Sequence, residues 1–171
     1  MAKRTLIITL GLLLSFWSCG YHLRGTGSSL PPHIQRISIP TFKNLTTRYQ
    51  LDVKLTRKVI EEMIARGKVE VTSETNKADA VLNGEILSFR VNPIAFTGQA
   101  SADRYNITIV ARIVLRDVAR GKIIFSNPSF IYQQEYEVPE GSDFESVETE
   151  AIDKIAEKFA RSLVITILEG F

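Results

Sequence analysis

The sequence contains very little cysteine and histidine, with one cysteine and two histidines in 171 residues. A single cysteine cannot form an internal disulfide, so the cysteine content does not reveal the redox compartment. The histidines, His22 and His33, are not spaced as metal ligands, and they make a Ser-His-acid arrangement improbable. A dinucleotide motif is missing too, because Gly25 and Gly27 lack the third glycine. We therefore expect no catalytic activity, no metal and no cofactor.

Long apolar runs are missing as well. The run at residues 6–16 is too short to cross a bilayer as a stable helix, which takes about 20 apolar residues. It follows Lys3 and Arg4, and this order of a positive region and an apolar region is typical of an export signal. The alternatives are an ordinary signal peptide with a coincidental cysteine, and a short anchor that is never cut.

Cys19 lies directly after this run and after the small residue Ser18, as in the lipobox of bacterial lipoproteins. We expect residues 1–18 to be a lipoprotein signal peptide and residues 19–171 to be a single periplasmic domain. Diacylglycerol would be attached to the Cys19 sulfur, and acyl chains would hold the protein on the membrane. Because Gly20 rather than Asp follows the cysteine, we expect the periplasmic face of the outer membrane.

Charge of one sign is not in excess once the leader is removed. Loss of Lys3 and Arg4 leaves 19 basic and 19 acidic side chains. A neutral domain lacks the basic footprint of a nucleic-acid-binding protein. The charges are segregated, however, since residues 19–122 carry 16 basic and 9 acidic side chains and residues 123–171 carry 3 and 10. Two solvated faces explain this better than a dipolar binding surface.

Two segments have the pattern of amphipathic helices. Residues 47–66 place apolar side chains on one side, with Asn44 and the following threonines as possible N-caps and Gly67 as the stop. The expected buried side chains of this helix are Leu51, Leu55, Val59, Ile60, Met63 and Ile64. A second helix begins with a capping box at Ser142 and Glu145. Its expected buried side chains are Phe144, Val147, Ala151, Ile155, Phe159, Leu163 and Ile167.

The remaining periodicity is that of strands. Residues 105–116 alternate most regularly, a turn at residues 117–121 leads into a return strand interrupted at Asn127 and Pro128, and shorter strands are expected at residues 37–42 and 68–73. Residues 80–91 change the parity of their apolar side chains after Gly84, which predicts a bulge or a strong twist. Three long consecutive strands form an antiparallel meander. We predict an α+β two-layer sandwich, with two amphipathic helices on one face of a mainly antiparallel sheet of four or more strands.

The loop predicted at residues 92–102 is unusual because it presents apolar side chains, Ile94 and Phe96, where a polar turn would suffice. Two arginines, Arg90 and Arg104, flank it. Exposed apolar side chains of this kind are natural contacts for a partner protein or a lipid.

A family resemblance rests first on the motif Cys-Gly-Tyr-His-Leu-Arg-Gly at residues 19–25. Directly after an export leader, this motif resembles the start of the mature chain in the LptE family of lipopolysaccharide-assembly lipoproteins. The rest of the layout is similar: a short strand, a helix, a meander with Gly98-Gln99 at a tip, Asn127-Pro128 before the last strand, and a final helix.

The resemblance implies a non-enzymatic outer-membrane lipoprotein that plugs the LptD β-barrel, supports its assembly and contacts lipopolysaccharide. Ile94 and Phe96 would then contact the barrel wall or lipid, and Arg90 and Arg104 would bind the phosphates of lipid A as arginine forks do. The alternative is that both arginines have no binding role and are ordinary solubilising charges at strand ends.

Two other functions stay open at this point. One is a self-assembling lipoprotein of another outer-membrane secretion or assembly machine, which would form rings of itself. The other is a soluble lipid carrier, which would need a deep apolar cavity in place of a filled core.

Overall fold

A computed structural model describes residues 30–96, 102–139 and 144–169 of the chain. The predicted signal peptide, Cys19, the motif at residues 19–25, the Gly98-Gln99 tip and Ser142 of the capping box lie outside these residues. The described elements, in order, are β1 (Arg36–Ser38), β2 (Lys43–Asn44), α2 (Leu51–Arg66), β3 (Glu70–Thr72), the 3-10 turn η2 (Thr75–Lys77), β4 (Ala80–Phe96), β5 (Ala102–Asp117), β6 (Ile123–Glu137) and α3 (Phe144–Glu169).

The six strands form one mixed sheet in the order β3-β1-β4-β5-β6, with β2 also paired to β4. The short strands pair in parallel, β1 with β3 and β4, and β2 with β4. The long strands β4, β5 and β6 are antiparallel neighbours. The predicted meander and the mainly antiparallel α+β sandwich are thus confirmed.

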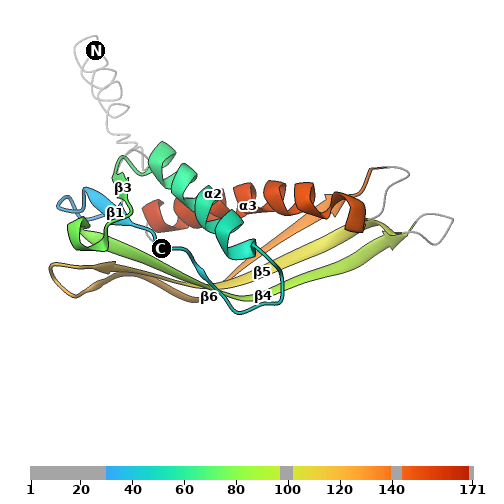
Figure 1. The fold of residues 1–171 in the computed structure, drawn as a ribbon, viewed down its shortest axis with the longest axis horizontal. Coiled ribbons are helices and arrows are strands. Elements are labelled where there is room, and N and C mark those ends of the chain that lie inside the picture. Colours follow the sequence, from blue (N-terminus) through green and yellow to red (C-terminus); the bar gives the residue numbers. More distant parts are fainter. Residues whose placement is uncertain (1–29, 97–101, 140–143, 170–171) are drawn as a thin grey trace, which may run out of the picture.

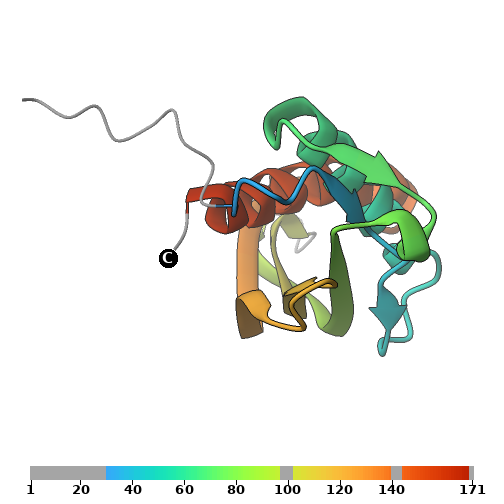
Figure 2. The ribbon, with the colours of Figure 1, turned by 90° about the vertical axis from the view of Figure 1, so that its left-hand side faces the viewer.

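Both helices cover the same face of this sheet (Figure 1), and the view from the end of the molecule shows them together above the strands (Figure 2). The opposite face of β4, β5 and β6 carries no helix in the described part of the chain. Along β5 the side chains alternate accordingly, with Ile107, Ile109 and Ile113 buried under the helices and Arg112 and Arg116 exposed on the other side.

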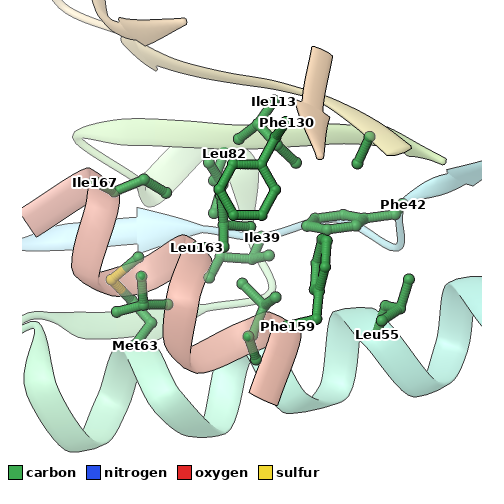
Figure 3. Close-up of a cluster of buried hydrophobic side chains, with 14 of the residues drawn as sticks. Ile39, Phe42, Leu55, Met63, Leu82, Ile113, Phe130, Phe159, Leu163 and Ile167 are labelled. Atoms are coloured by element: carbon green, nitrogen blue, oxygen red, sulfur yellow. The ribbon is translucent and has the colours of Figure 1, made fainter. Parts of the chain in front are cut away.

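The core lies between the helices and the sheet (Figure 3). Phe159 of α3 is fully buried and packs edge-to-face against Phe130 at 5.5 Å and Tyr132 at 6.1 Å between ring centroids, both on β6. The predicted buried face of α3 is confirmed from Ala151 to Ile167, while Val147 is half-buried.

α2 begins later than predicted, at Leu51 rather than near residue 47. The Asn44 side chain accepts hydrogen bonds from Thr46 N–H and Oγ1 at 2.9 and 2.8 Å, and donates one to the Arg48 carbonyl at 2.7 Å. These bonds hold the segment as a turn, so its polar side chains compete with the helix instead of capping it. The chain enters α2 only after Gln50, whose φ is 55°.

The apolar face of α2 also differs from the prediction in one residue. Leu51, Leu55, Val59 and Met63 are fully buried and Ile60 is partly buried, but the Ile64 side chain is 58% exposed. Thr56 is buried in addition. Its Oγ1 accepts a hydrogen bond from the backbone N–H of Phe42 at 2.9 Å, so the buried hydroxyl has a partner.

The predicted irregularities of the long strands are present as bulges. The register of β4 against β5 shifts between Ile86 and Ser88, which accounts for the change of parity after Gly84. β6 is one strand rather than two, since the residues at Pro128 and Ser129 bulge opposite Arg112 and pairing continues on both sides.

The predicted loop at residues 92–102 is wrong in part, because residues 92–96 belong to β4 and Ala102 to β5. Pro93 lies opposite Tyr105, and the register shifts directly after it. A proline is tolerated here because the described pairing of this part of β4 is with β5 alone, so no second neighbour needs its missing N–H.

Polar contacts fasten the chain before β1 to the sheet. His33 Nε2 lies 2.7 Å from Oδ2 of Asp117, whose side chain is only 3% exposed. The backbone N–H of Arg120 and then the His33 side chain hydrogen-bond this carboxylate, and both lower its pKa below the ordinary value. Since the pKa is lowered in the folded state, the contribution to stability is present above the ordinary carboxyl pKa and is lost as the pH falls.

Candidate interaction surface

The end of the β4–β5 hairpin, here residues 92–96 with residues 102–104, is the candidate surface. The two strands extend past the N-terminal end of α3 (Figure 1). Two large apolar side chains of β4, Ile94 and Phe96, are 45% and 63% exposed there. Ile94 lies at the register shift between Pro93 and Ala95, so a local bulge helps to set its direction. The structure thus keeps these two predicted contact residues together and exposed, on a strand rather than a loop.

Arg90 and Arg104 are both exposed and lie on one face of the hairpin. Arg90 is opposite Thr108, and Arg104 is opposite Ala95 on one side and Glu137 of β6 on the other. Thr108 and Arg104 have the same parity on β5, which is the parity of the face without helices. Four residues of strand separate them, or roughly 13 Å. The two guanidinium groups therefore share a face without forming one tight pair.

An arginine that the sequence did not single out connects the helices to the sheet. The Arg48 guanidinium lies 5.4 Å from the centroid of the Phe89 ring and pairs with Glu148 of α3. Nothing in the local sequence pattern indicates this contact, because its three parts come from a turn, a strand and a helix. It holds the beginning of α3 against the part of β4 that leads into the hairpin end.

Opposite charges meet between the two helices. Lys54 Nζ of α2 lies 2.5 Å from Asp153 Oδ1 of α3, and Arg161 of α3 lies 3.9 Å from Glu62 of α2. Lys54 belongs to the basic first part of the chain and Asp153 to its acidic last part, whereas the Arg161–Glu62 pair joins the minority charges of the two parts.

The described residues hold no group of three or more His, Cys, Asp or Glu side chains that could bind a metal ion. The groove between α2 and α3 is open to solvent and is lined mainly by charged side chains, among them Lys58, Glu150 and Asp153. Such a groove does not resemble the deep apolar cavity that a lipid carrier needs. Within the described ranges, neither α2 nor α3 is long and apolar enough to span a bilayer.

Comparison with known proteins gives a match to one family model. The model described as LptE, lipopolysaccharide-assembly, matches residues 34–167, which is most of the chain. The comparison with curated proteins gives no significant match.

Solved structures with the same fold include two bacterial proteins of low sequence identity to this chain. The PelC dodecamer from Paraburkholderia phytofirmans has a TM-score of 0.55 at 14% identity, over 86% of this chain and 96% of that chain. Uncharacterized lipoprotein B from Nitrosomonas europaea has a TM-score of 0.54 at 13% identity, over 87% of this chain and 90% of that chain. At such identities the likeness shows the fold alone.

Proposed function

The chain belongs to the LptE family of lipopolysaccharide-assembly proteins, and on this premise we propose that it plugs and helps to assemble the LptD β-barrel and contacts lipopolysaccharide on its way to the outer leaflet. The family is one of non-enzymatic outer-membrane lipoproteins. The observation that carries the proposal beyond the family is the hairpin end, where Ile94 and Phe96 remain exposed on strands that extend past α3.

Physical arguments support a contact of this end with a barrel wall or lipid. Covering these two exposed apolar side chains stabilises a complex with a partner by about 25 cal/mol for each Å² of apolar area buried. Both side chains also lie on a strand that pairs with β5, so less ordering entropy is lost on binding than for an unpaired segment. The helices and their buried core lie to one side and leave the end accessible.

The anchor is proposed to be the lipidated Cys19, after removal of residues 1–18, which would hold residues 19–171 at the periplasmic face of the outer membrane. Replacement of Cys19 by alanine is expected to abolish incorporation of radiolabelled palmitate, because the sulfur that accepts diacylglycerol is missing. Since this is the chain's one cysteine, equal labelling of the variant and the wild-type chain would rule out the anchor.

The plug role is tested by a mild-detergent pull-down of the tagged full chain from the source bacterium. The wild-type chain is expected to bring down an outer-membrane barrel protein one to one, as quantified by mass spectrometry. The double variant Ile94→Asp/Phe96→Asp should recover at least tenfold less of the barrel protein, because two charges would then face an apolar contact. Ile123→Asp/Ile131→Asp is the matched control, since both isoleucines are exposed on β6, and it should retain the barrel protein.

Recovery of rings of the tagged chain without a barrel protein would contradict the plug role. It would favour the second candidate, a self-assembling lipoprotein of another outer-membrane machine. PelC from Paraburkholderia phytofirmans forms a dodecamer, which gives that candidate its interest, although the likeness concerns the fold alone.

Lipopolysaccharide contact is assigned to Arg90 and Arg104. Charge reversal of both, Arg90→Glu/Arg104→Glu, is expected to weaken binding of lipopolysaccharide by the full chain on the order of tenfold or more. The charge-assisted hydrogen bonds from arginine to phosphate are lost, and the new carboxylates repel the phosphates. Binding is measured by titration with labelled lipopolysaccharide, with circular dichroism to check the fold. Arg120→Glu/Lys122→Glu, at exposed positions in the β5–β6 turn region, controls for net charge, and equal losses in the two variants would remove the assignment.

A further inference from the structure

Residues 30–35, here called the strap, lie at one end of the sheet, in front of β1. This end faces the viewer in Figure 2, with the strap in blue. The backbone N–H of Ile34 donates to the Pro31 carbonyl at 2.9 Å, which closes a turn with Pro32 in its second position. Proline is favoured there because its ring fixes φ near the value that the turn requires. The sequence thus bends the strap at a set place and puts His33 in the third position of the turn.

Two apolar side chains attach the strap to the core. Leu30 and Ile34 are both buried and belong to the main hydrophobic cluster. Between them Pro32 is exposed, and Gln35 is exposed after them. The strap therefore lies on the surface and enters the core at two points.

The first polar contact joins the strap to the end of β5. His33 Nε2 lies 2.7 Å from Asp117 Oδ2, and the backbone N–H of Arg120 donates to Oδ1 at 2.9 Å. An ionised carboxylate only accepts hydrogen bonds, so His33 donates in this contact. The Asp117 side chain is 3% exposed, and a carboxylate so buried needs partners for its oxygens. Loss of the His33 side chain would leave Oδ2 without this partner.

The second polar contact joins the strap to the beginning of β4. Asp79 Oδ2 accepts the backbone N–H groups of Arg36 at 2.8 Å and Gln35 at 3.0 Å. These two bonds, Arg36 first, lower the pKa of Asp79 below its ordinary value. The Asp79 carbonyl in turn accepts the N–H of Val118, next to Asp117, at 2.9 Å. His33, Asp79 and Asp117 are thus connected, and we call these three residues the clasp.

We propose that the clasp fixes the point at which the segment between Cys19 and the strap leaves the fold, and that without the His33–Asp117 contact the strap opens as a unit while the sheet and helices stay folded. Opening would add the strap to that segment. Six residues span at most about 20 Å when extended. The clasp lies at the opposite end of β5 from the hairpin end, roughly 50 Å away along a strand of 16 residues.

The strap and its clasp do not depend on the proposed function. Their effect on the reach of a membrane anchor does rest on lipidation of Cys19. Opening of the strap is measured on the full chain itself, purified in mild detergent. A failure of palmitate labelling would therefore remove the effect on the anchor and leave the clasp.

The first experiment is hydrogen exchange of the full chain, followed by mass spectrometry. His33→Ala is expected to speed up exchange at Gln35 and Arg36 about tenfold or more, because a hydrogen bond to a charged group is lost and the strap opens more often. These two amides bond to Asp79 and not to His33, so the effect reaches them only if the strap opens as a unit. Peptides from β5 and α3 should stay within about twofold of the wild-type rate.

Two further variants separate the contact from a general change at this end of the molecule. His33→Gln should keep exchange close to the wild-type rate, because the glutamine amide can donate to the same carboxylate. Glu74→Gln is the matched control, since it removes an exposed ion pair with Lys77 at the same end. It should leave exchange in the strap unchanged.

The second experiment is limited proteolysis with trypsin, which cuts after Arg36 only when the backbone there is released. The Arg36 carbonyl accepts the N–H of Asp79 at 2.9 Å in the closed state. His33→Ala should be cut after Arg36 at least five times faster than the wild-type chain, and His33→Gln and Glu74→Gln should not. The new N-terminus at Ile37 is identified by mass spectrometry.

Three results overturn the proposal. Exchange and cleavage of His33→Ala within twofold of the wild-type chain would show that the contact does not hold the strap. An equal rise of exchange in β5 and α3 would show that it supports the whole fold instead. A His33→Gln variant as open as His33→Ala would show that the hydrogen bond to Asp117 is not the link.

Discussion

Truncation of Phe159 to alanine is expected to destabilise the fold by about 3–5 kcal/mol, the range for removing a buried aromatic side chain. Phe159 is fully buried, and its ring packs edge-to-face against both Phe130 and Tyr132. Its loss would open a cavity where α3 lies on β6, and the two remaining rings would lose a shared partner. The free energy of unfolding is measured by urea denaturation of the full chain.

A matched control on the same strand separates burial from hydrophobicity. Ile131 is the neighbour of Phe130 and Tyr132 on β6, but its side chain is 59% exposed on the face without helices. Ile131→Ala should therefore change stability by less than about 0.5 kcal/mol. A loss under about 1 kcal/mol in Phe159→Ala would mean that α3 does not depend on this contact.

The parts of the fold that the sequence predicted well are those with strong periodicity. The inner face of α3 and the alternation of β5 are confirmed because many residues repeat the same signal and neighbouring segments do not compete. The start of α2 was missed for the opposite reason. Asn44 and Thr46 have the side chains of helix caps, but they hydrogen-bond within their own turn.

Ile64 and the hairpin end show the limit of reading one segment at a time. A helical spacing identifies which side chains share a face, but the width of the face that is covered depends on α3 and the sheet, so Ile64 was wrongly assigned to the core. The loop predicted at residues 92–102 was wrong in part, since residues 92–96 continue β4, where a strand with one neighbour can hold Pro93. The contact of Arg48 with Phe89 and Glu148 needs three distant segments, and no local pattern predicts it.

Gly84 is the position where the smallest substitution should have a large effect. A Cβ atom added there would lie 2.7 Å from three atoms of the Phe42 ring, well inside van der Waals contact. The Phe42 ring has little freedom to retreat, since it is 2% exposed and its backbone N–H is bonded to Thr56 Oγ1 of α2. Gly84→Ala should therefore cost about 1–3 kcal/mol through overpacking, and Gly84→Val should lie at the upper end or beyond.

A double-mutant cycle shows whether the Phe42 ring is the cause. In the Phe42→Leu background the aromatic face is gone, so Gly84→Ala should cost less than in the wild-type chain, with a coupling energy of about 0.5–3 kcal/mol between contacting sites. Asn83→Ala, at the exposed neighbouring position on β4, should change stability by less than about 0.5 kcal/mol. Additive costs for Gly84→Ala and Phe42→Leu would show that contact with the Phe42 ring does not cause the destabilisation by Gly84→Ala. The cost would then arise from the strand itself.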